Sequence, residues 1–451
     1  MPIAVVILAA GQGTRMNSDL PKVLHKLAGA PLLRHVMQTA EAIGAERTVI
    51  VTGHGGEKVE AAAREAGEAC QFARQEERLG TGHAVLQAAP ALRDFSGDVL
   101  VLYGDTPMIR PETLESMLKA RREGAAVVVL GFEATDPSGY GRLILGQDGS
   151  LKRIVEEHEA TPDERAITLC NSGVIAAESA ALFELLADVR DDNAKGEYYL
   201  TDIVGLARAR GWPAAVIACD ESETLGINSR RDLARAETAF QTRARADVLE
   251  NGVTLADPAT TWFAFDTVIG RDVEIGPSVY FGPGVTVESG ATIHAFCHLE
   301  GCHISRGARV GPFARLRPGA ELAEDTRIGN FVEIKNALVD EGGKVNHLSY
   351  VGDAHIGAAA NIGAGTITCN YDGVFKNHTE IGAGAFIGSN SALVAPVSVG
   401  ANAIVGAGSV ITEAVPDGAL AVARGRQKTK PGFGRRLMDK LKDAKRKREA
   451  G

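Results

Sequence analysis

The hydrophobic residues between Ile269 and Ile411 recur at every sixth position, with occasional one-residue shifts. A small or β-branched residue often stands two positions before them, as at Ala308, Ala385 and Ser409. A period of six fits neither an amphipathic helix nor a two-faced strand, and no alternating strands bounded by hairpin turns favour a β-sandwich. It predicts short parallel strands wound around a prism, a hexapeptide β-helix that is stable only as a stack. The recurring residues are Ile269, Ile275, Phe281, Val287, Ile293, Leu299, Ile304, Val310, Leu316, Leu322, Ile328, Ile334, Val339, Val345, Val351, Ile356, Ile362, Ile381, Ile387, Leu393, Val399, Val405 and Ile411.

The first half of the chain follows a different pattern. Residues 3–8 form a continuous apolar run, which is typical of a strand buried on both faces of a parallel sheet. Further apolar strands alternate with amphipathic helical patterns, the strands at 48–51 and 99–103 and the helices at 32–42, 57–66 and 112–122. This order predicts an α/β, Rossmann-like domain with a ligand site beyond the carboxyl ends of its strands.

Two further segments complete the organisation of the chain. Good helix formers with few glycines predict a connecting helix over 229–249. Residues 422–451 are rich in Lys and Arg and predict an extended basic arm, helical in part over 435–447. We therefore expect an α/β domain at 1–228, a helical linker at 229–249, a β-helix domain at 250–421 and the arm at 422–451.

Composition narrows the class of protein. A length of 451 residues favours two or more domains, and the net charge of −9 argues against a general nucleic-acid binder despite the basic end. Six cysteines without CxxC spacing favour reduced thiols and a reducing cytosol. The chain moves straight into a strand and holds no apolar run of membrane-spanning length. We expect a cytoplasmic protein without membrane insertion.

A glycine-rich loop follows the first strand, from Leu8 to Met16, with Lys22 shortly after it. It matches neither the dinucleotide motif nor the P-loop, but its glycines let backbone N–H groups approach an anion. Arg15 and Lys22 can neutralise charge on a phosphoryl group. Asp105 ends another buried strand, where a carboxylate caps a turn more often than it binds a metal. Its pairing with the glycine loop favours a Mg²⁺ site.

These two motifs resemble those of the sugar-phosphate nucleotidyltransferases. With the hexapeptide coil added, residues 3–430 resemble the bacterial bifunctional N-acetylglucosamine-1-phosphate uridyltransferase/glucosamine-1-phosphate N-acetyltransferases. The resemblance implies a left-handed parallel β-helix, Mg²⁺, the co-substrates UTP and acetyl-CoA, a homotrimer, and no nucleic-acid partner. It implies acetylation of glucosamine-1-phosphate, then uridylyl transfer to N-acetylglucosamine-1-phosphate, giving UDP-N-acetylglucosamine, a cell-envelope precursor.

The resemblance also implies residues for the uridylyl transfer. Asp105 and Asn228 correspond to metal ligands, and Arg15 and Lys22 to charge-neutralising catalytic groups. Gln12 departs from the family, where a basic residue is common, and His83 is expected to be structural. The positions that correspond to nucleotide and sugar contacts are Leu8, Ala9, Ala10, Gly11, Lys22, Gln75, Gly80, Thr81, Tyr103, Gly104, Asp105, Gly141, Glu156, Asn171 and Asn228.

The hexapeptide period is interrupted over 330–336, 346–350 and 369–376, and interruptions in a solenoid generally map to a binding face. His347 with Glu333 is a candidate general-base pair within these stretches. The resemblance implies that His347 is the base for acetyl transfer, with a backbone donor near Tyr371 as an oxyanion hole. It implies glucosamine-1-phosphate contacts at Arg317, Lys335, Tyr350 and Asn361, and acetyl-CoA contacts at Ala364, Asn370, Tyr371, Ser389, Ala407 and Arg424.

Three other hypotheses remain open from the residues. The coil can be only an oligomerisation scaffold, or the chain can be a regulatory subunit that binds nucleotide without turnover. Lys22, Asp105 and Asn228 speak against the regulator, because a degenerate site is expected to lose some of them. A shared zinc, as in the gamma-type carbonic anhydrases, needs a histidine spacing that the coil lacks, so these histidines are expected on solvated faces, at His294, His298, His303, His355 and His378.

Overall fold

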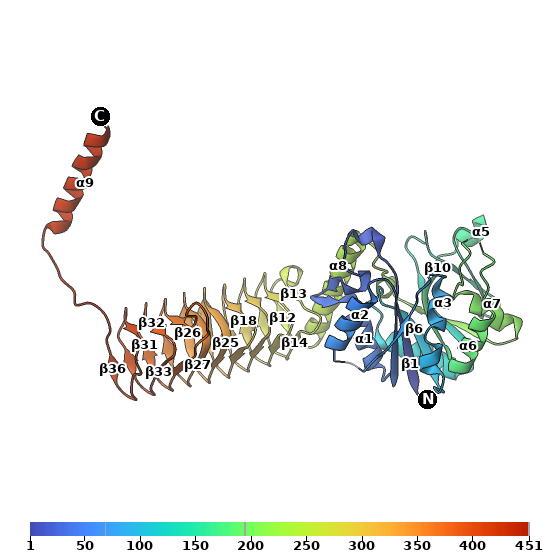
Figure 1. Cartoon of the computed structure of the whole chain (residues 1–451), viewed down its shortest axis with the longest axis horizontal. Coiled ribbons are helices and arrows are strands. Elements are labelled where there is room, and N and C mark those ends of the chain that lie inside the picture. Colours follow the sequence, from blue (N-terminus) through green and yellow to red (C-terminus); the bar gives the residue numbers. More distant parts are fainter. Residues whose placement is uncertain (68, 194, 450–451) are drawn as a thin grey trace. The chain divides into compact units, whose positions relative to one another are not determined.

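The computed structural model describes residues 1–67, 69–193 and 195–449. The chain divides into two compact units (Figure 1). The first comprises Met1–Glu250 with Trp262–Thr267, and the second comprises Asn251–Thr261 with Val268–Gly451.

The first unit is built on a nine-stranded sheet with β1 near its centre. β1 pairs in parallel with β4 on one side and β6 on the other, as the predicted βαβ order requires. β10 departs from the parallel sheet that the sequence predicted, because it runs antiparallel to both β6 and β7. The strands follow the order β11 (Ala214–Cys219), β7 (Val127–Glu133), β10 (Leu169–Glu178), β6 (Asp98–Tyr103), β1 (Ile3–Ala9), β4 (Arg47–Thr52) and β5 (Gln71–Arg74), with the hairpin β8 (Arg142–Leu145) and β9 (Leu151–Val155) off this path.

Two hydrophobic clusters cover the two faces of this sheet. Successive β1 side chains alternate between them, with Val5 and Ile7 in one cluster and Ala4 and Val6 in the other. This alternation explains why the sequence of β1 is apolar throughout. The helices predicted over 32–42, 57–66, 112–122 and 229–249 form within one residue of their expected ends. The helices of this unit are α1 (Leu32–Ala42), α2 (Gly56–Glu65), α3 (Thr81–Leu86), α4 (Pro111–Arg122), α5 (Pro162–Arg165), α6 (Ser179–Ala187), α7 (Asp202–Ala209) and α8 (Arg230–Glu250).

The second unit is a left-handed parallel β-helix (Figure 1). One face is a ten-stranded sheet in which every third strand of the chain pairs in parallel until β24. Its strands are β12 (Thr254–Leu255), β15 (Glu274–Ile275), β18 (Thr292–Ile293), β21 (Arg309–Val310), β24 (Arg327–Asn330), β26 (Lys344–His347), β28 (Asn361–Ile362), β31 (Phe386–Ile387), β34 (Ile404–Val405) and β36 (Leu420–Ala421).

The other two faces join into one fifteen-stranded sheet, because β25 and β27 are seven residues long and turn from one face to the next. Its strands are β13 (Trp262–Phe263), β14 (Val268–Ile269), β16 (Tyr280–Phe281), β17 (Thr286–Val287), β19 (His298–Leu299), β20 (Cys302–Ile304), β22 (Arg315–Leu316), β23 (Ala320–Leu322), β25 (Glu333–Val339), β27 (Tyr350–Ile356), β29 (Ile367–Cys369), β30 (Thr379–Ile381), β32 (Ala392–Val394), β33 (Val397–Val399) and β35 (Val410–Ile411).

The hexapeptide pattern marks the interior of this coil. Every recurring residue from Ile275 to Ile411 is buried, and Ile269 is half-buried. The small residues two positions earlier are buried as well, including Ala308, Ala385 and Ser409. The predicted β-helix is therefore confirmed, although its first strand, β12, lies before the first recurring residue.

Beyond the coil, α9 (Phe433–Glu449) forms a longer helix than the 435–447 segment that the sequence predicted. All its described side chains are exposed. Within the described residues, no helix is both long and apolar enough to cross a membrane.

Candidate active sites

A cavity of about 290 Å³ lies at the carboxyl end of β1 in the first unit. Backbone and side-chain atoms of the glycine loop form one wall, because β1 ends there and the loop turns away from the sheet. Ten of the positions predicted for the nucleotide and sugar line it, namely Leu8, Ala9, Ala10, Gly11, Lys22, Gln75, Gly80, Thr81, Tyr103 and Asp105. The structure thus gathers residues that are almost a hundred positions apart in sequence.

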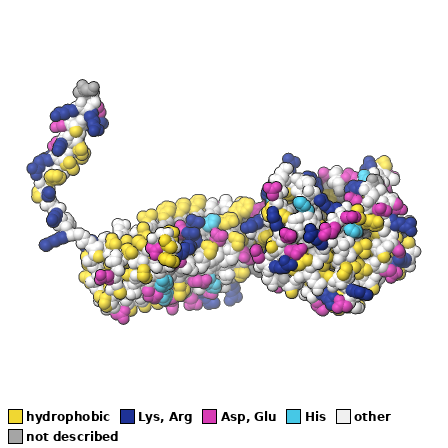
Figure 2. All heavy atoms as spheres, in the orientation of Figure 1, with side chains coloured by type: hydrophobic (Ala, Val, Ile, Leu, Met, Phe, Trp, Pro, Cys, Tyr) yellow, Lys and Arg dark blue, Asp and Glu magenta, His cyan; other side chains and the backbone are white. Residues whose placement is uncertain are grey.

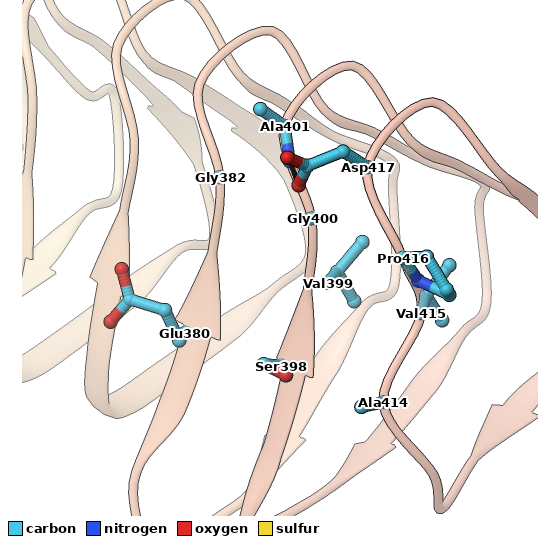
Figure 3. Close-up of a pocket in the computed structure, with 10 residues that line it drawn as sticks. All are labelled: Glu380, Gly382, Ser398, Val399, Gly400, Ala401, Ala414, Val415, Pro416 and Asp417. Carbon is cyan, nitrogen blue, oxygen red and sulfur yellow. Dashed lines mark hydrogen bonds between the residues drawn. The ribbon is translucent and has the colours of Figure 1, made fainter.

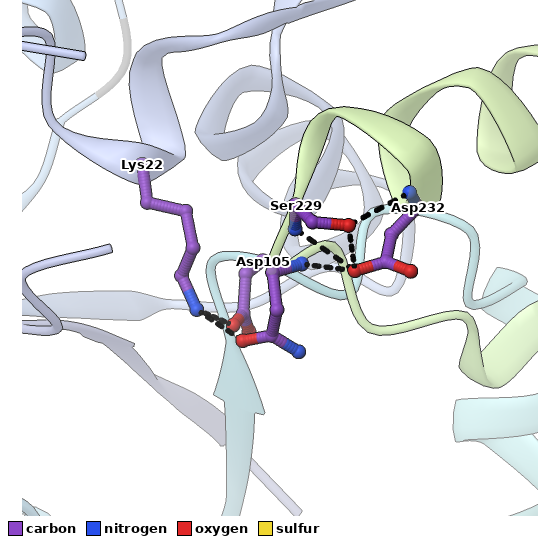
Figure 4. Close-up of polar contacts among 5 residues, drawn as sticks. Lys22, Asp105, Ser229 and Asp232 are labelled. Atoms are coloured by element: carbon purple, nitrogen blue, oxygen red, sulfur yellow. Dashed lines mark hydrogen bonds and ion pairs between the residues drawn. The ribbon is translucent and has the colours of Figure 1, made fainter. Parts of the chain in front are cut away.

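Lys22 joins the two predicted metal ligands (Figure 4). Its ammonium donates to Asp105 Oδ2 and, at 3.0 Å, to Asn228 Oδ1. Both oxygen atoms therefore converge on a single cation, and carboxylate and amide oxygens are donors that suit Mg²⁺. This donor set fits the metal that the sequence predicted.

Asp232 holds the segment that carries Asn228. Its Oδ2 accepts hydrogen bonds from Asn228 N at 3.1 Å, Ser229 N at 2.8 Å and Ser229 Oγ at 2.9 Å. The Ser229 hydroxyl in turn accepts from Asp232 N at 3.2 Å, which is the reciprocal arrangement of a helix capping box. The first turn of α8, whose Ser229 and Asp232 are labelled in Figure 4, thus fixes the backbone of Asn228.

Two charged residues line this cavity that sequence reasoning missed, Arg78 and Glu197. The Arg78 guanidinium donates to Gln12 Oε1 at 2.8 Å. Gln12 is the position where a basic residue was expected, so Arg78 brings a positive charge to the same side of the loop. Its place beside Leu79 and Gly80 in the sequence was the only available signal.

The predicted sugar contacts form a second group outside this cavity. Asn171 N donates to Gly141 O at 2.8 Å, and a side chain at Gly141 would meet Glu156 Oε1 at 3.5 Å. Burial raises the pKa of Glu156. The Tyr103 ring packs against Gly173, whose φ of +89° sits in a register shift of β10, and so links this group to the cavity.

Two predicted positions stand apart from these groups. Arg15 lies exposed on the short helix η1 (Thr14–Met16) of the glycine loop, and no polar contact is seen for it in the described part of the chain. Gly104 donates its N–H to Leu8 O at 3.0 Å, where a Cβ would come within 3.0 Å of Val23. Gly104 therefore allows β6 to approach β1 rather than presenting a side chain to ligand.

In the second unit, His347 lies exposed at the end of β26 and pairs in register with Asn330 of β24. The His347 Nδ1 to Asn330 Oδ1 distance is 2.7 Å. The expected pairing of His347 with Glu333 is not what the described contacts show, because Glu333 accepts from Arg317 Nη1 at 2.8 Å. The period-six pattern hid this difference, since residues 330 and 333 lie on different faces of the same coil.

A cluster of cations surrounds Glu333. Arg317 contacts it directly, Lys335 follows it on the same strand, and Tyr350 pairs with it in register on β27. A hydrogen bond with Lys376, together with the charge of that residue, lowers the pKa of Lys335. Lys376 is a cation at this cluster that the sequence reasoning did not assign. Asn361 lies on β28, paired in register with Lys344 of β26, the strand that ends at His347.

The predicted acetyl-CoA contacts form a ladder along one corner of the coil. Asn390 N donates to Ala364 O at 2.7 Å, and Gly408 N donates to Ser389 O at 2.8 Å. The Arg424 guanidinium then donates to Ala407 O. Ala364, Ser389, Ala407 and Arg424 therefore belong to successive turns that stack on one another.

Asn370 and Tyr371 begin a loop that leaves the coil. The Asn370 amide donates to Asp353, which also accepts from Asn336 at 2.6 Å. Tyr371 is exposed and its hydroxyl donates to Gly373 O at 2.6 Å. The start of the loop is therefore held by hydrogen bonds among Asn336, Asp353 and Asn370, which lie on three successive turns of the coil.

Comparisons with known proteins agree with both halves of this geometry. Residues 5–199 match the MobA-like NTP transferase domain, and residues 266–301 and 378–413 match the bacterial transferase hexapeptide (six repeats). The bifunctional protein GlmU of Dinoroseobacter shibae is 63% identical over 99% of both chains. That of Cereibacter sphaeroides strain ATCC 17025 is 63% identical over 98% of this chain and 97% of its own, and that of Jannaschia sp. strain CCS1 is 57% identical over 99% and 98%.

The chain belongs to the family of the bifunctional protein GlmU. Like its GlmU relatives it is a bifunctional enzyme, with a nucleotidyltransferase domain followed by hexapeptide acyltransferase repeats. The sequence prediction of the family and of the two fold classes is confirmed.

The coil also holds a hollow of about 500 Å³ near its last turns, lined by Glu380, Ser398 and Asp417 among others (Figure 3). No predicted ligand contact lines it, and Asp417 there accepts a hydrogen bond from Ala401 N at 2.8 Å. The five coil histidines expected on solvated faces are exposed or half-buried. Over the described residues, no cluster of three or more His, Cys, Asp or Glu side chains is arranged to hold a metal.

Proposed function

We propose that the first unit transfers a uridylyl group from UTP to N-acetylglucosamine-1-phosphate, releasing pyrophosphate. A sugar-phosphate oxygen attacks the α-phosphorus in line, and the protein contributes position and charge rather than a covalent intermediate. Lys22 and Arg15 are proposed to stabilise negative charge on the phosphates. The cavity supports this assignment because it brings the glycine loop, Lys22 and Asp105 to one place.

Asp105 and Asn228 are proposed to hold Mg²⁺. When bound there, Mg²⁺ would supply positive charge that neutralises the negative charge developing during phosphoryl transfer. Their oxygens share the Lys22 ammonium, so Lys22 and a metal compete for the same two atoms. We infer that Lys22 turns from these oxygens toward the nucleotide phosphates as the substrates bind. Gly141, Glu156 and Asn171 are proposed to contact the sugar, and Gln75 the uracil.

We propose that the second unit transfers an acetyl group from acetyl-CoA to the amine of glucosamine-1-phosphate. Asn330 Oδ1 can only accept a hydrogen bond, so in this assignment His347 Nδ1 carries the proton and Nε2 is basic. His347 Nε2 then takes the proton that the amine loses as it attacks the thioester carbonyl; the C–S bond breaks, the amide forms, and coenzyme A leaves as the thiol after protonation. Arg317, Lys335 and Lys376 offer positive charge to the sugar phosphate, with Tyr350 and Asn361 as further contacts.

The acetyl-CoA subsite is proposed along the corner ladder that runs from Ala364 to Arg424, with Asn370 and Tyr371 at its start. A thioester carbonyl placed near the Tyr371 backbone would develop its negative charge beside N–H donors. The product of this reaction is the acceptor of the uridylyl transfer, so acetylation comes first.

We also propose that the enzyme is a homotrimer. Phe296, Phe313 and Phe331 stand at the same corner in three successive turns of the coil and stack with centroid distances of 4.8 and 5.2 Å. They are 52%, 46% and 55% exposed, and Leu348 continues the row beside His347. A contiguous apolar row of this kind supports contact with neighbouring copies around a closed axis.

The observation that carries the proposal is that the Lys22 ammonium contacts side-chain oxygens of both Asp105 and Asn228 beside the glycine loop. Incubation with acetyl-CoA, glucosamine-1-phosphate, UTP and Mg²⁺, followed by mass analysis, tests it. UDP-N-acetylglucosamine is expected, and its absence would contradict the proposal. His347→Ala should abolish acetyl transfer and leave uridylyl transfer intact; unchanged acetyl transfer would instead favour a coil that is only a scaffold.

A further inference from the structure

Over residues 433–444 the terminal helix α9 separates apolar and charged side chains around its axis, whereas Lys445 and Arg448 of its last turns fall on the apolar side. At 100° per residue, Phe433, Leu437, Met438, Leu441 and Ala444 fall within an arc of about 140°. The four large side chains are 45–54% exposed, so this apolar arc is open on the helix surface. An exposed apolar stripe on a helix rich in charges indicates an amphipathic element rather than a uniformly solvated one.

The charged residues follow a second pattern. One basic row, at Arg435, Lys442 and Arg446, borders the apolar arc on one side, and another, at Arg436, Lys440 and Lys447, borders it on the other. Asp439 and Asp443 lie between the two rows, opposite the apolar arc. The helix carries eight Lys or Arg and three Asp or Glu, in a chain whose net charge is −9. Figure 2 shows hydrophobic and basic side chains side by side along α9.

This arrangement discriminates between possible partners. A nucleic acid needs only the positive charge, so it gives no reason for an open apolar arc. A bundle of α9 copies would bring the basic rows of adjacent helices together on both sides of the seam, where like charges repel. A lipid surface accounts for the apolar arc, for the two basic rows beside it and for the acidic residues on the opposite side.

We propose that α9 is an interfacial anchor that lies flat on an anionic phospholipid surface without crossing it. The apolar arc enters the boundary between headgroups and acyl chains, and the flanking Lys and Arg side chains extend upward to anionic headgroups. Asp439 and Asp443 face water. Seventeen residues give a helix of about 25 Å, enough for three turns of apolar contact.

The segment between the coil and α9 adds to the attraction. Arg426, Lys428 and Lys430 precede the helix and are exposed, which extends the basic character toward the coil. Basic residues close to an anionic bilayer each strengthen adsorption, and salt weakens it. The inference is independent of the proposed reactions, since none of these residues was assigned to a substrate.

The test uses the full-length chain and sedimentation with phosphatidylcholine vesicles, with or without phosphatidylglycerol, at about 0.15 M salt. Wild-type protein should sediment only with the anionic vesicles. Leu437→Ser with Leu441→Ser keeps the charge and should lower vesicle binding roughly tenfold or more, because two buried side chains are lost.

A charge-matched pair tests the role of the basic rows. Arg436→Gln with Lys440→Gln removes two charges from a row. Lys445→Gln with Arg448→Gln removes two charges from the last turns, beyond Ala444, where both residues lie on the apolar side of the helix and outside both rows. The first pair should weaken binding more than the second. Both activities and the oligomeric state should be unchanged in every variant.

Three results would overturn the proposal. They are failure of wild-type protein to bind anionic vesicles, equal binding by the Leu437→Ser, Leu441→Ser variant, and a change of oligomeric mass in that variant without vesicles. The second result would indicate simple attraction to any polyanion, which duplex DNA binding by the same variant would identify. The third would indicate that a second copy covers the apolar arc.

Discussion

Arg78 shows how one residue can supply what a neighbouring position lacks. Its guanidinium lies in the first-unit cavity and contacts Gln12, where a basic side chain was expected. Sequence reasoning could identify the glycine loop but not this contact, because 66 residues separate the two positions. That Arg78 supplies a positive charge beside Gln12 becomes visible only when the fold brings the glycine loop after β1 next to the segment after β5.

Arg78→Gln should therefore raise the KM for UTP about tenfold, since a charge-assisted contact to phosphate is lost. The kcat for acetyl transfer should stay the same. Steady-state kinetics measures both, and Arg93→Gln, outside the residues that line the cavity, is the matched control. An unchanged KM for UTP would show that Arg78 only supports Gln12.

Asp232 is a second residue whose role depends on a contact rather than a motif. It accepts two backbone hydrogen bonds at Asn228 and Ser229, and so positions a proposed metal ligand.

Asp232→Ala should weaken divalent-metal binding about tenfold. Mn²⁺ titration followed by electron paramagnetic resonance measures this without turnover. Asp232→Asn keeps an acceptor oxygen and should behave nearly like wild type; a similar loss in both variants would mean that the carboxylate charge, not the hydrogen bonding, matters.

At the scale of elements, the sequence predicted the β-helix better than the sheet. A hexapeptide period reports directly on which side chains face the interior, and nearly all of them are buried. No sequence pattern indicated that β10 is antiparallel, because an apolar strand has the same composition in either direction. The interruptions of the period over 330–336 and 346–350 include the first residues of the long strands β25 and β27, and the pattern did not indicate that each strand continues around a corner.

The strands also carry a charge network on the outer face of the coil. His355 Nε2 lies 2.8 Å from Asp340 Oδ2, and His355 Nδ1 lies 2.7 Å from Glu380 Oε1. The other carboxylate oxygen of Glu380, Oε2, lies 3.2 Å from His378 Nε2. Burial acts to lower the pKa of His355, but the hydrogen bonds to the two carboxylates outweigh it and raise that pKa. The His355 ring thus bridges three neighbouring turns.

His355→Gln should destabilise the coil mainly at acidic pH. A raised pKa favours the charged form in the folded state, so the stabilisation is present below the ordinary value of 6.5 and disappears as pH rises through the raised value. The difference in free energy of unfolding should be about 0.5–1 kcal/mol at pH 5.5, since the group is partly exposed. Thermal unfolding at pH 5.5 and 8.5 measures it, with His294→Gln as control. An equal effect at both pH values would indicate packing instead.

At the scale of the whole molecule, the proposed trimer rests on the row of stacked phenylalanines. Phe313 occupies its middle, with Phe296 and Phe331 on either side. Phe313→Ser should shift the mass in solution from three chains toward one, because the apolar row is interrupted. Light scattering measures this, and circular dichroism checks that the coil stays folded.

Tyr280→Ser is the control for the trimer test. Tyr280 stacks on His298 at 4.8 Å and is similarly exposed, but it belongs to a different row. It should leave the mass unchanged. A Phe313→Ser protein with the mass of the wild type would contradict the proposed interface.

The corner ladder from Ala364 to Arg424 has a consequence for how such an enzyme can diversify. Each rung belongs to a separate winding of the same spiral, spaced by about 4.8 Å along its axis. Inserting or deleting one complete turn of the coil before β24 would leave the distances among Ala364, Ser389, Ala407 and Arg424 unchanged. The same change between these residues would shift some of them along the coil axis relative to the others. Length variation among relatives is therefore expected to come in whole windings, and on the amino-terminal side of the ladder.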